Sequence, residues 1–281
     1  MAAYYNEIDP YAAQWLRNLI QAGHIAPGDV DERSIVSVTA DDIKSYTQCH
    51  FFAGIGVWSH SLRNAGWADD RRVWTGSCPC QPFSTAGARA GFSDERHLWP
   101  ELFRLITELE PFTVIGEQVA SKDGYAWLDL VQSDLENRDY TFGAVVTPAS
   151  GFGAPHQRHR MYWVADSTNS GWFGQGEGTT IQAGWEQRPK PTRKLESRLE
   201  GCTVSRDELP TAVEPRDFWS SPEWLQCSDG RSRPVEPGTF PLAHGATSRV
   251  GRLRAYGNAI CAPQAEAFIS SYMQLIGEAN V

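Results

Sequence analysis

The chain has 281 residues and a formal net charge of -9. This length allows one full-sized domain plus a smaller one, since domains cluster at roughly 100 to 200 residues. The acidic balance excludes a protein that coats nucleic acid non-specifically, because Lys and Arg supply most of that binding when they neutralise phosphates. It leaves room for an enzyme that reads nucleic acid through a local basic patch.

The apolar segments and the cysteines exclude further classes. No uninterrupted apolar run approaches the roughly 18 residues of a membrane span, and the N-terminus lacks the basic and apolar pattern of a signal peptide. We therefore expect a cytoplasmic protein with no membrane partner. The six cysteines lack regular spacing, which predicts thiols rather than a disulfide framework. The pair Cys78-Pro79-Cys80 is too tight for the usual zinc knuckle, so no metal is expected.

The first part of the chain alternates between helical and extended patterns. Apolar residues recur at helical spacing over residues 9–23, and Pro10 suits the first turn. Residues 49–53 predict a strand that breaks into Gly54-Ile55-Gly56 and continues as a helix to Leu62. Further on, the patterns predict strands over 72–77, 112–115 and 161–165, and helices over 98–109 and 127–136. This alternation predicts an α/β fold with an open, mostly parallel sheet.

The composition changes after residue 166. Residues 167–248 are rich in Gly, Pro, Ser and Thr, which predicts a small, loop-rich lobe. Helical spacing returns in the last segment, at Ala265, Ile269 and Met273. We therefore predict a main domain over residues 1–166, the lobe over 167–248, and a segment over 249–281 that returns to the main domain.

Two short motifs at strand ends carry chemical information. Gly54-Ile55-Gly56 lets the backbone approach a nucleotide-like ligand at a helix N-terminus, although two glycines alone are more often a plain turn. Pro79-Cys80-Gln81 is more specific, because prolines fix the backbone around a cysteine at the carboxyl end of a strand, where open parallel sheets place their sites. Such a thiol is a nucleophile when nearby cations or helix ends stabilise its thiolate. A buried structural cysteine is the alternative.

With these motifs in place, the sequence resembles the DNA cytosine-5 methyltransferase family. The matching segments are Phe52-Ala53-Gly54-Ile55-Gly56 for the cofactor motif, Pro79-Cys80-Gln81 for the catalytic motif, Gly116-Glu117-Gln118-Val119 for Glu-Asn-Val, residues 153–160 for the Gln-x-Arg-x-Arg segment, and Tyr256-Gly257-Asn258-Ala259-Ile260 for the closing motif. They follow the family's order. The resemblance implies a Rossmann-like, S-adenosylmethionine-dependent methyltransferase whose catalytic domain is residues 1–166 and whose target-recognition lobe is residues 167–248.

The N-terminus departs from the family's order. Too few residues separate Gly54 from Cys80 to hold the family's second and third cofactor segments. Residues 6–12, which include Glu7, and Gly28-Asp29-Val30 resemble those missing segments. We therefore predict a rearranged order, in which the N-terminal strand and helix lie next to the glycine-turn strand although they precede it in sequence.

The resemblance implies methyl transfer to carbon 5 of cytosine through a covalent Cys80 adduct. Cys80 would attack carbon 6 of the base, and Glu117 would donate to or protonate ring nitrogen 3. Arg160, supported by Arg158, would bind the carbonyl oxygen of the base. Alternation along a strand would place both arginines on one face. The plain alternative is a pair of surface arginines.

The implied cofactor is S-adenosylmethionine. Glu7 would accept hydrogen bonds from the ribose hydroxyls, Ile8 would pack on the adenine, and Asp29 would meet the adenine amino group. An ordinary solvated carboxylate is the alternative for both acidic residues. The other cofactor contacts implied by the resemblance are Phe52, Ala53, Gly54, Ile55, Gly56, Pro79, Asn258 and Ala259.

The implied partner is double-stranded DNA. A base inside a duplex is out of reach of Cys80, so the target would be flipped out of the stack. Residues 84–96 are expected to form a loop that closes over it, and the basic residues between Arg188 and Arg198 are candidates for reading the site.

Several points stay open on sequence alone. Gln118 and His156 stand where the family usually has Asn and Gln, which leaves the fine positioning of the catalytic groups unsettled. A transfer RNA substrate, a catalytically silent DNA-binding regulator, and a small-nucleotide substrate are alternatives, although the lobe favours duplex DNA. We expect a monomer, and the compact form is typical of an orphan or phage-borne relative of restriction-modification enzymes.

Overall fold

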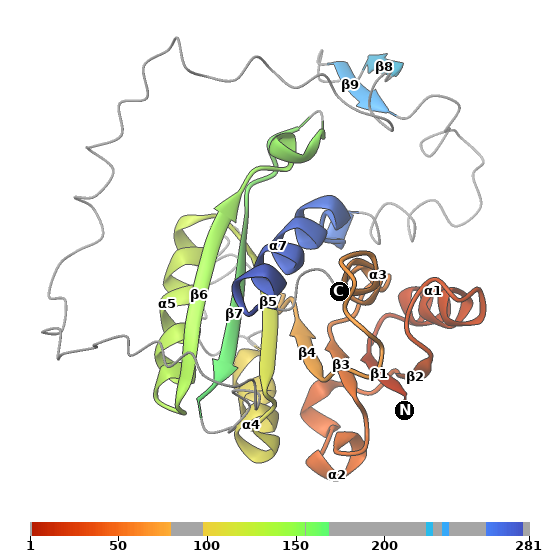
Figure 1. Ribbon diagram of the computed structural model, residues 1–281. Helices are drawn as coiled ribbons and strands as arrows, with labels where there is room; N and C mark the ends of the chain where they lie inside the picture. Colours follow the sequence, from red (N-terminus) through yellow and green to blue (C-terminus); the bar gives the residue numbers. More distant parts are fainter. Residues whose placement is uncertain are drawn as a thin grey trace, which may run out of the picture.

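A computed structural model describes residues 2–79, 98–154, 156–168, 223–226, 232–235 and 257–277. Its centre is a seven-stranded sheet in the order β2-β1-β3-β4-β5-β7-β6 (Figure 1). The strands are β1 (Ala3–Asn6), β2 (Gly28–Asp31), β3 (Gln48–Phe51), β4 (Val73–Gly76), β5 (Thr113–Val119), β6 (Tyr140–Thr147) and β7 (Arg160–Ser167). A separate antiparallel pair joins β8 (Glu223–Gln226) to β9 (Ser232–Val235). Cys80, the expected loop over 84–96 and the basic residues 188–198 lie outside the described residues.

The sheet is mostly parallel, as predicted. β1 pairs in parallel with β2 and with β3, and the pairs β3–β4 and β4–β5 are also parallel. β7 runs antiparallel between β5 and β6. In register, Asn6 lies opposite Phe51, and Phe51 lies opposite Gly76. The carboxyl ends of β1, β3 and β4 therefore meet at one edge of the sheet, which confirms the predicted rearranged order.

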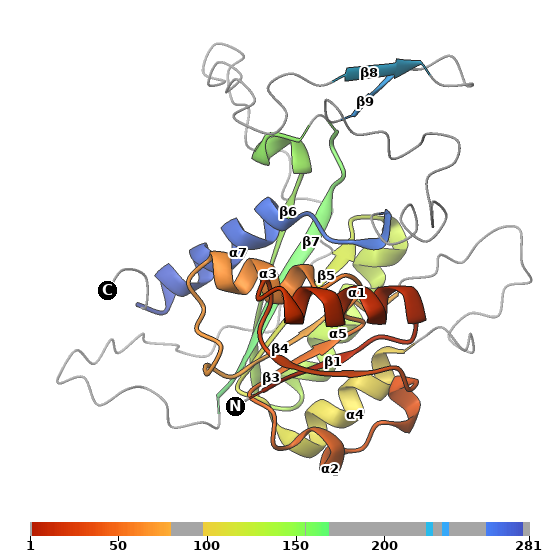
Figure 2. The same cartoon turned by 90° about the vertical axis from the view of Figure 1, so that its right-hand side faces the viewer.

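Helices cover both faces of the sheet (Figure 2). One face carries α1 (Pro10–Gln21), α3 (Val57–Asn64) and α7 (Ala262–Leu275), and the other carries α2 (Ala40–Ile43), α4 (Trp99–Leu109) and α5 (Lys122–Glu136). A short 3₁₀ turn, η1 (Ile35–Ser37), follows β2. The core on the α4 side is strongly aromatic, because Trp99 packs edge-to-face on Trp127 and Trp163. No helix in this described part of the chain is long and apolar enough to cross a membrane.

Short-range sequence features explain where α1 and α3 begin. The Asp9 carboxylate caps α1 by accepting hydrogen bonds from the amides of Tyr11 (2.9 Å) and Ala12 (3.2 Å). Gly56 precedes α3 in a left-handed conformation (φ 81°), which glycine adopts without steric cost. A methyl group at Gly56 would also come within 3.0 Å of Leu16 on α1. The glycine turn therefore lets α1 and α3 pack closely beside each other.

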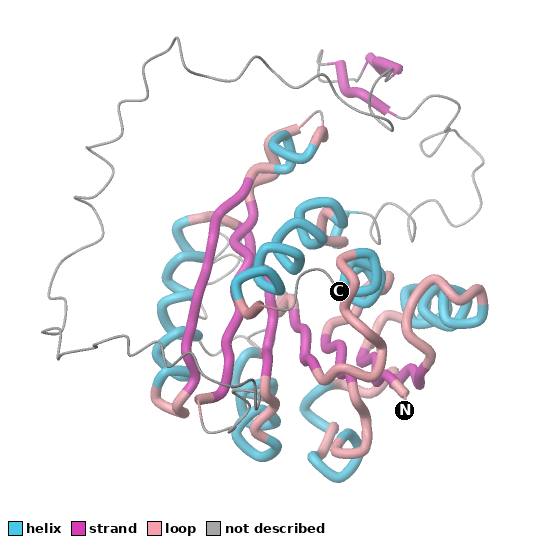
Figure 3. The backbone as a smooth tube through the Cα atoms, viewed as in Figure 1, coloured by secondary structure: helices cyan, strands magenta, loops and turns pink. Residues whose placement is uncertain are grey.

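Two elements differ from the prediction. β5 continues to Val119, so Glu117 lies inside the strand and not beyond its end. β6 was not predicted, because most of its residues are exposed on an edge strand and show no strict alternation. Together β6 and β7 form a long hairpin that rises beyond the helical layers and ends at η3 (Ala149–Phe152) (Figure 3). The chain returns from this tip to β7 through the segment that carries Arg158.

Candidate active site

A cavity of about 440 Å³ lies at the carboxyl edge of the parallel strands. Its walls come from the ends of β1, β3, β4 and β5, from the start of β7 and from the segment before α7. It is lined by Asn6, Glu7, Ile8, Asp9, Tyr11, Ala12, Arg33, Ser34, Ile35, Phe52, Gly54, Ile55, Ser77, Cys78, Pro79, Leu98, Glu117, Gln118, Val119, Arg158, Arg160, Gly257 and Asn258. This is where open α/β sheets bind their ligands.

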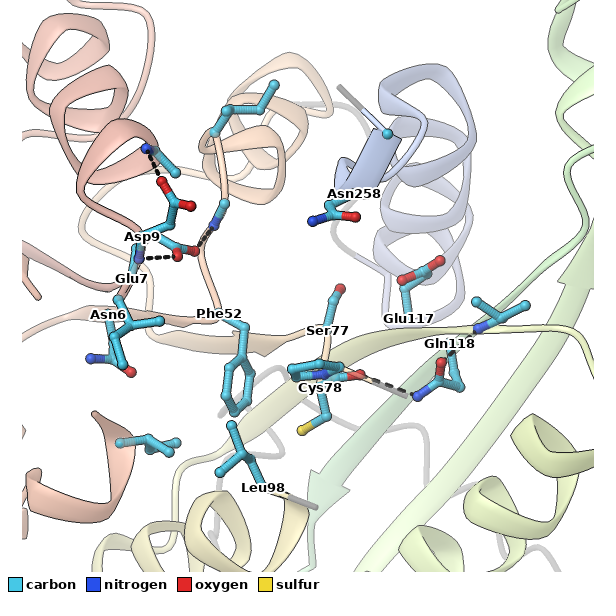
Figure 4. A pocket seen from close by; sticks show the side chains of 18 of the residues that line it. Asn6, Glu7, Asp9, Phe52, Ser77, Cys78, Leu98, Glu117, Gln118 and Asn258 are labelled. Atoms are coloured by element: carbon cyan, nitrogen blue, oxygen red, sulfur yellow. Dashed lines mark hydrogen bonds between the residues drawn. The ribbon is translucent and has the colours of Figure 1, made fainter. Parts of the chain in front are cut away.

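The Glu7 carboxylate joins the N-terminal segment to the glycine turn. One oxygen accepts a hydrogen bond from the amide of Gly54 (2.7 Å), and the other accepts one from the amide of Asp9 (2.9 Å) (Figure 4). Each carboxylate oxygen has two lone pairs. Glu7 therefore keeps acceptor capacity for hydroxyl groups of a ligand in the cavity.

An apolar part of the cavity lies beside Glu7. Ile8 lines it with 64% of its surface exposed, together with Phe52, Ile35 and Leu98. Phe52 adopts a left-handed conformation (φ 53°), which is uncommon for a bulky residue and clusters at ligand sites. These side chains offer an apolar surface to a flat ring.

Asp29 does not line the cavity. Its carboxylate accepts a hydrogen bond from the hydroxyl of Tyr46 (2.8 Å). In the β1–β2 register Asp29 lies opposite Tyr4, two residues before the strand end, whereas Asp31 lies opposite Asn6 at the edge. Asp31 in turn binds the guanidinium of Arg33 (2.7 Å), and it is Arg33 that lines the cavity.

Glu117 and Arg160 form a largely buried ion pair. The Nε atom of Arg160 lies 2.6 Å from a carboxylate oxygen of Glu117, and the two side chains are only 16% and 10% exposed. Burial raises the pKa of Glu117, while the charges of Arg160 and Arg158 and a hydrogen bond from Ser77 lower it. A carboxyl group under these opposing influences is suited to hold or share a proton with a bound base.

The Ser77 hydroxyl donates a hydrogen bond to the Glu117 carboxylate. Its hydroxyl oxygen accepts a hydrogen bond from the indole nitrogen of Trp58 (3.0 Å). An indole N–H can only donate, so the hydroxyl hydrogen of Ser77 remains available for Glu117. Ser77 belongs to none of the sequence motifs, although it directly precedes the Cys78-Pro79-Cys80 segment.

Gln118 contacts the backbone that leads to Cys80. Its side-chain nitrogen donates to the carbonyl oxygen of Cys78 (3.3 Å), and its side-chain oxygen accepts from the amide of Val119 (2.9 Å). Gln118 is buried and lines the cavity. Gln118 stands where the family pattern has the shorter asparagine. Its hydrogen bond to Cys78 connects β5 to the segment before Cys80.

Arg158 lies before β7 in a left-handed conformation (φ 31°). The predicted strand alternation of Arg158 with Arg160 is therefore wrong, yet both arginines line the same cavity. One terminal nitrogen of Arg158 donates to the carbonyl oxygens of Gly257 (2.9 Å) and Ala259 (2.8 Å). His156 is exposed and does not line the cavity.

The structure brings together most of the predicted site residues. Glu7, Ile8, Phe52, Gly54, Ile55, Pro79, Glu117, Arg158, Arg160 and Asn258 line one cavity, whereas Ala53, Gly56, Asp29 and Ala259 do not. The residues missed from sequence include Asn6, Asp9, Arg33, Ser34, Ser77, Cys78 and Leu98. Asn6 and Asp9 flank Glu7 and could have been found there. Arg33 and Leu98 belong to no motif and depend on the fold.

Parts of the sequence are similar to known cytosine-specific DNA methylases. Residues 67–200 match the sequence profile of the C-5 cytosine-specific DNA methylase family. The type II methyltransferase M.HhaI of Haemophilus parahaemolyticus is 34% identical over 99 residues, which cover 34% of this chain and 30% of the relative. The type II methyltransferase M.NlaX of Neisseria lactamica is 27% identical over 165 residues, which cover 57% of this chain and 43% of the relative. The chain thus spans less than half of either relative.

A solved structure of a Spodoptera frugiperda DNMT2 variant also aligns with the chain. Its TM-score is 0.41 at 17% sequence identity, and the alignment covers 61% of this chain and 44% of that one.

Gly116, next to Glu117, provides a test of how the site is held in the sheet. A methyl group at Gly116 would lie 2.2 Å from a ring carbon of Trp163, which is fully buried. We expect Gly116→Ala to lower the free energy of unfolding by about 2 kcal/mol or more, because the indole or the strand must shift. Urea unfolding monitored by circular dichroism measures this change.

Gly143→Ala is the matched control, since Gly143 lies in the same sheet on β6 with no atom within 4 Å of the added methyl group. We expect that variant to stay within about 0.5 kcal/mol of the unmodified protein. Equal losses in the two variants would show that the contact between Gly116 and Trp163 does not constrain this part of the site.

Proposed function

We propose that the chain, whose residues 67–200 match the profile of C-5 cytosine-specific DNA methylases and which is similar in part to type II methyltransferases, transfers a methyl group from S-adenosylmethionine to carbon 5 of cytosine in double-stranded DNA. One observation carries the proposal. A single cavity joins the Glu7 and Gly54 unit, suited to a nucleoside, to the Glu117–Arg160 pair, suited to a polar base. Pro79, directly before Cys80, lines the same cavity.

The residues present fit this cofactor. The cavity volume of about 440 Å³ is within the range of small-molecule sites. Glu7 offers carboxylate lone pairs to the ribose hydroxyls, and Ile8 and Phe52 offer apolar surfaces to the adenine. When bound, S-adenosylmethionine supplies an electrophilic methyl group on a sulfonium.

The chemistry assigned to the chain follows from the weak nucleophilicity of carbon 5. The Cys80 thiolate adds to carbon 6, and the electron pair of the 5,6 double bond moves onto carbon 5 as Glu117 gives a proton to ring nitrogen 3. Arg160 binds the carbonyl oxygen of the base and stabilises the charge that develops. After methylation, water takes the proton from carbon 5, and its electron pair restores the 5,6 double bond as the Cys80 thiolate leaves carbon 6. Ring nitrogen 3 returns its proton to Glu117, which closes the cycle.

The surroundings of Glu117 support its role as the proton donor. Burial is the largest influence on this carboxyl group and raises its pKa. Arg160 opposes that effect from 2.6 Å without cancelling it, so the pKa of Glu117 stays above its usual value. A base that brings ring nitrogen 3 to this carboxyl group could then accept or share its proton.

The remaining expectations stay predictions. Base flipping and a target-recognition lobe over 167–248 are implied by the family resemblance and by the need of Cys80 to reach a base. A monomeric state and action in the cytoplasm are expectations from the sequence. Of that lobe, the structure describes β8 and β9. The methyl-transfer assay described next distinguishes DNA methylation from the two alternatives, methylation of transfer RNA and a catalytically silent regulator.

Transfer of labelled methyl from S-adenosylmethionine tests the proposed activity. Duplex DNA, transfer RNA and free cytosine nucleotides serve as substrates, and Cys80→Ala serves as the control because it removes the nucleophile. We expect label in DNA as 5-methylcytosine, and none in the variant. Label in RNA alone would replace the proposed substrate, and cofactor binding without transfer to any substrate would favour the regulator.

Substitutions of Glu7 and Asp29, the two acidic residues expected from sequence to bind the cofactor, should differ in their effect on cofactor affinity. We expect Glu7→Gln to weaken binding of S-adenosylhomocysteine about tenfold or more, because hydrogen bonds to charged groups contribute about 1.5 to 3 kcal/mol. Asp29→Asn should stay within about twofold, since Asp29 lies outside the cavity. Isothermal titration calorimetry measures both dissociation constants.

Thermal unfolding without ligand shows whether Glu7→Gln keeps its fold, since the single acceptor oxygen of Gln can replace only one of the two bonds that Glu7 accepts from the amides of Gly54 and Asp9. Wild-type affinity in Glu7→Gln would remove Glu7 from the cofactor site. Equal weakening in Asp29→Asn would instead restore the assignment made from sequence.

A further inference from the structure

Arg158 makes contacts that differ from those of its neighbour Arg160. Arg160 is paired with the Glu117 carboxylate at 2.6 Å. A terminal nitrogen of Arg158 instead donates to two backbone carbonyl oxygens, those of Gly257 at 2.9 Å and Ala259 at 2.8 Å. The two arginines line one cavity, but the hydrogen bonds of Arg158 lead to the C-terminal segment.

Asn258 lies between the two residues whose carbonyl oxygens accept from Arg158. Gly257 and Asn258 line the cavity, and Figure 4 shows the Asn258 side chain pointing toward the space above Phe52 and Ser77. Hydrogen bonds to the carbonyl oxygens of Gly257 and Ala259 restrict the backbone around Asn258, and this backbone sets the direction of the Asn258 side chain. The Arg158 guanidinium therefore holds Asn258 at the cavity.

The rest of the C-terminal segment has anchors of its own. The Gln264 side chain donates to the Thr147 carbonyl oxygen (2.9 Å), and Ala265 and Ile269 are fully buried between α3 and the sheet. Losing the Arg158 contacts would then release residues 257–260 while α7 stays in place. The expected effect is local to one wall of the cavity.

We propose that Arg158 is a positioning residue for the cofactor, which orients Asn258 toward bound S-adenosylmethionine, and that it does not act on the cytosine. This inference rests on the proposed function for the identity of the ligand. It assigns the two arginines of one short segment to two different tasks. Arg160 serves the reacting base through its pair with Glu117, and Arg158 completes the cofactor wall.

Arg158→Asn is the most informative variant, because Asn tolerates the left-handed backbone at this position (φ 31°). We expect its dissociation constant for S-adenosylhomocysteine, measured by calorimetry, to rise about tenfold or more, since two charge-assisted hydrogen bonds are lost. The Michaelis constant for S-adenosylmethionine should rise in parallel, whereas kcat at saturating cofactor should fall far less than in Arg160→Lys, because Arg158 acts on Glu117 only through its charge and is not its ion-pair partner. Arg160→Lys should show the reverse pattern.

A double-mutant cycle separates this role from a general structural one. If Arg158 acts through Asn258, Arg158→Asn combined with Asn258→Ala should bind S-adenosylhomocysteine no more weakly than the weaker single variant. His159→Asn is the matched control, because His159 is exposed and does not line the cavity. It should bind as the unmodified protein does.

Two results would overturn the inference while leaving the proposed function intact. One is unchanged cofactor affinity in Arg158→Asn with a loss of kcat like that of Arg160→Lys, and the other is additive weakening in the double variant. If the unmodified protein failed to bind S-adenosylhomocysteine, both the inference and the proposed cofactor would fall. If it bound this ligand but methylated no nucleic acid, the calorimetric comparison would still decide the role of Arg158.

Discussion

The pairing of β1 with β3 is the constraint on which the rest of the site depends. It places the carboxyl end of β1 beside the glycine turn, so that the Glu7 carboxylate reaches the amide of Gly54 at 2.7 Å. An acidic residue and a glycine turn from segments far apart in sequence are thus joined at one wall of the cavity. A parallel sheet permits this rearrangement, because only the spatial order of the strand ends decides what lines the cavity.

The other half of the site depends on a buried charge that is compensated. Glu117 is 8% exposed and lies in the middle of β5, where an unpaired carboxylate would be costly. Arg160, at the start of β7, forms an ion pair with this carboxylate across the antiparallel β5–β7 pair. Ser77 also donates a hydrogen bond to the carboxylate and itself accepts one from Trp58. The same strands that support Glu117 also hold Gln118 against the segment before Cys80. Glu117, Arg160 and the segment before Cys80 are therefore connected through β4, β5 and β7.

Short motifs with narrow backbone or chemical demands point to many of the residues that line the cavity. The glycine turn, Pro79 before the cysteine, Glu117 and the acidic Glu7 were all predicted in this way, and they line one cavity. The rearranged position of β1 was also predictable, since the N-terminal segment resembles pieces that are missing further along the chain.

The failures have identifiable physical causes. Asp29 was chosen by resemblance, but the β1–β2 register places Asp31 and then Arg33 at the edge of the sheet. Arg158 was assigned by strand alternation, which does not apply to a left-handed residue before the strand. The contact of Ser77 with Trp58 joins side chains from different elements, and no local pattern reveals it.

Covalent trapping on duplex DNA that contains 5-fluorocytosine tests the central claim most directly. The reaction needs the cofactor pocket, the nucleophile and the bound base together, and fluorine at carbon 5 blocks the last proton loss, so the adduct persists. We expect a complex that survives denaturation, requires S-adenosylmethionine and maps by mass spectrometry to Cys80. An adduct on another residue, or no adduct from a random-sequence duplex pool that the protein binds together with the cofactor, would contradict it.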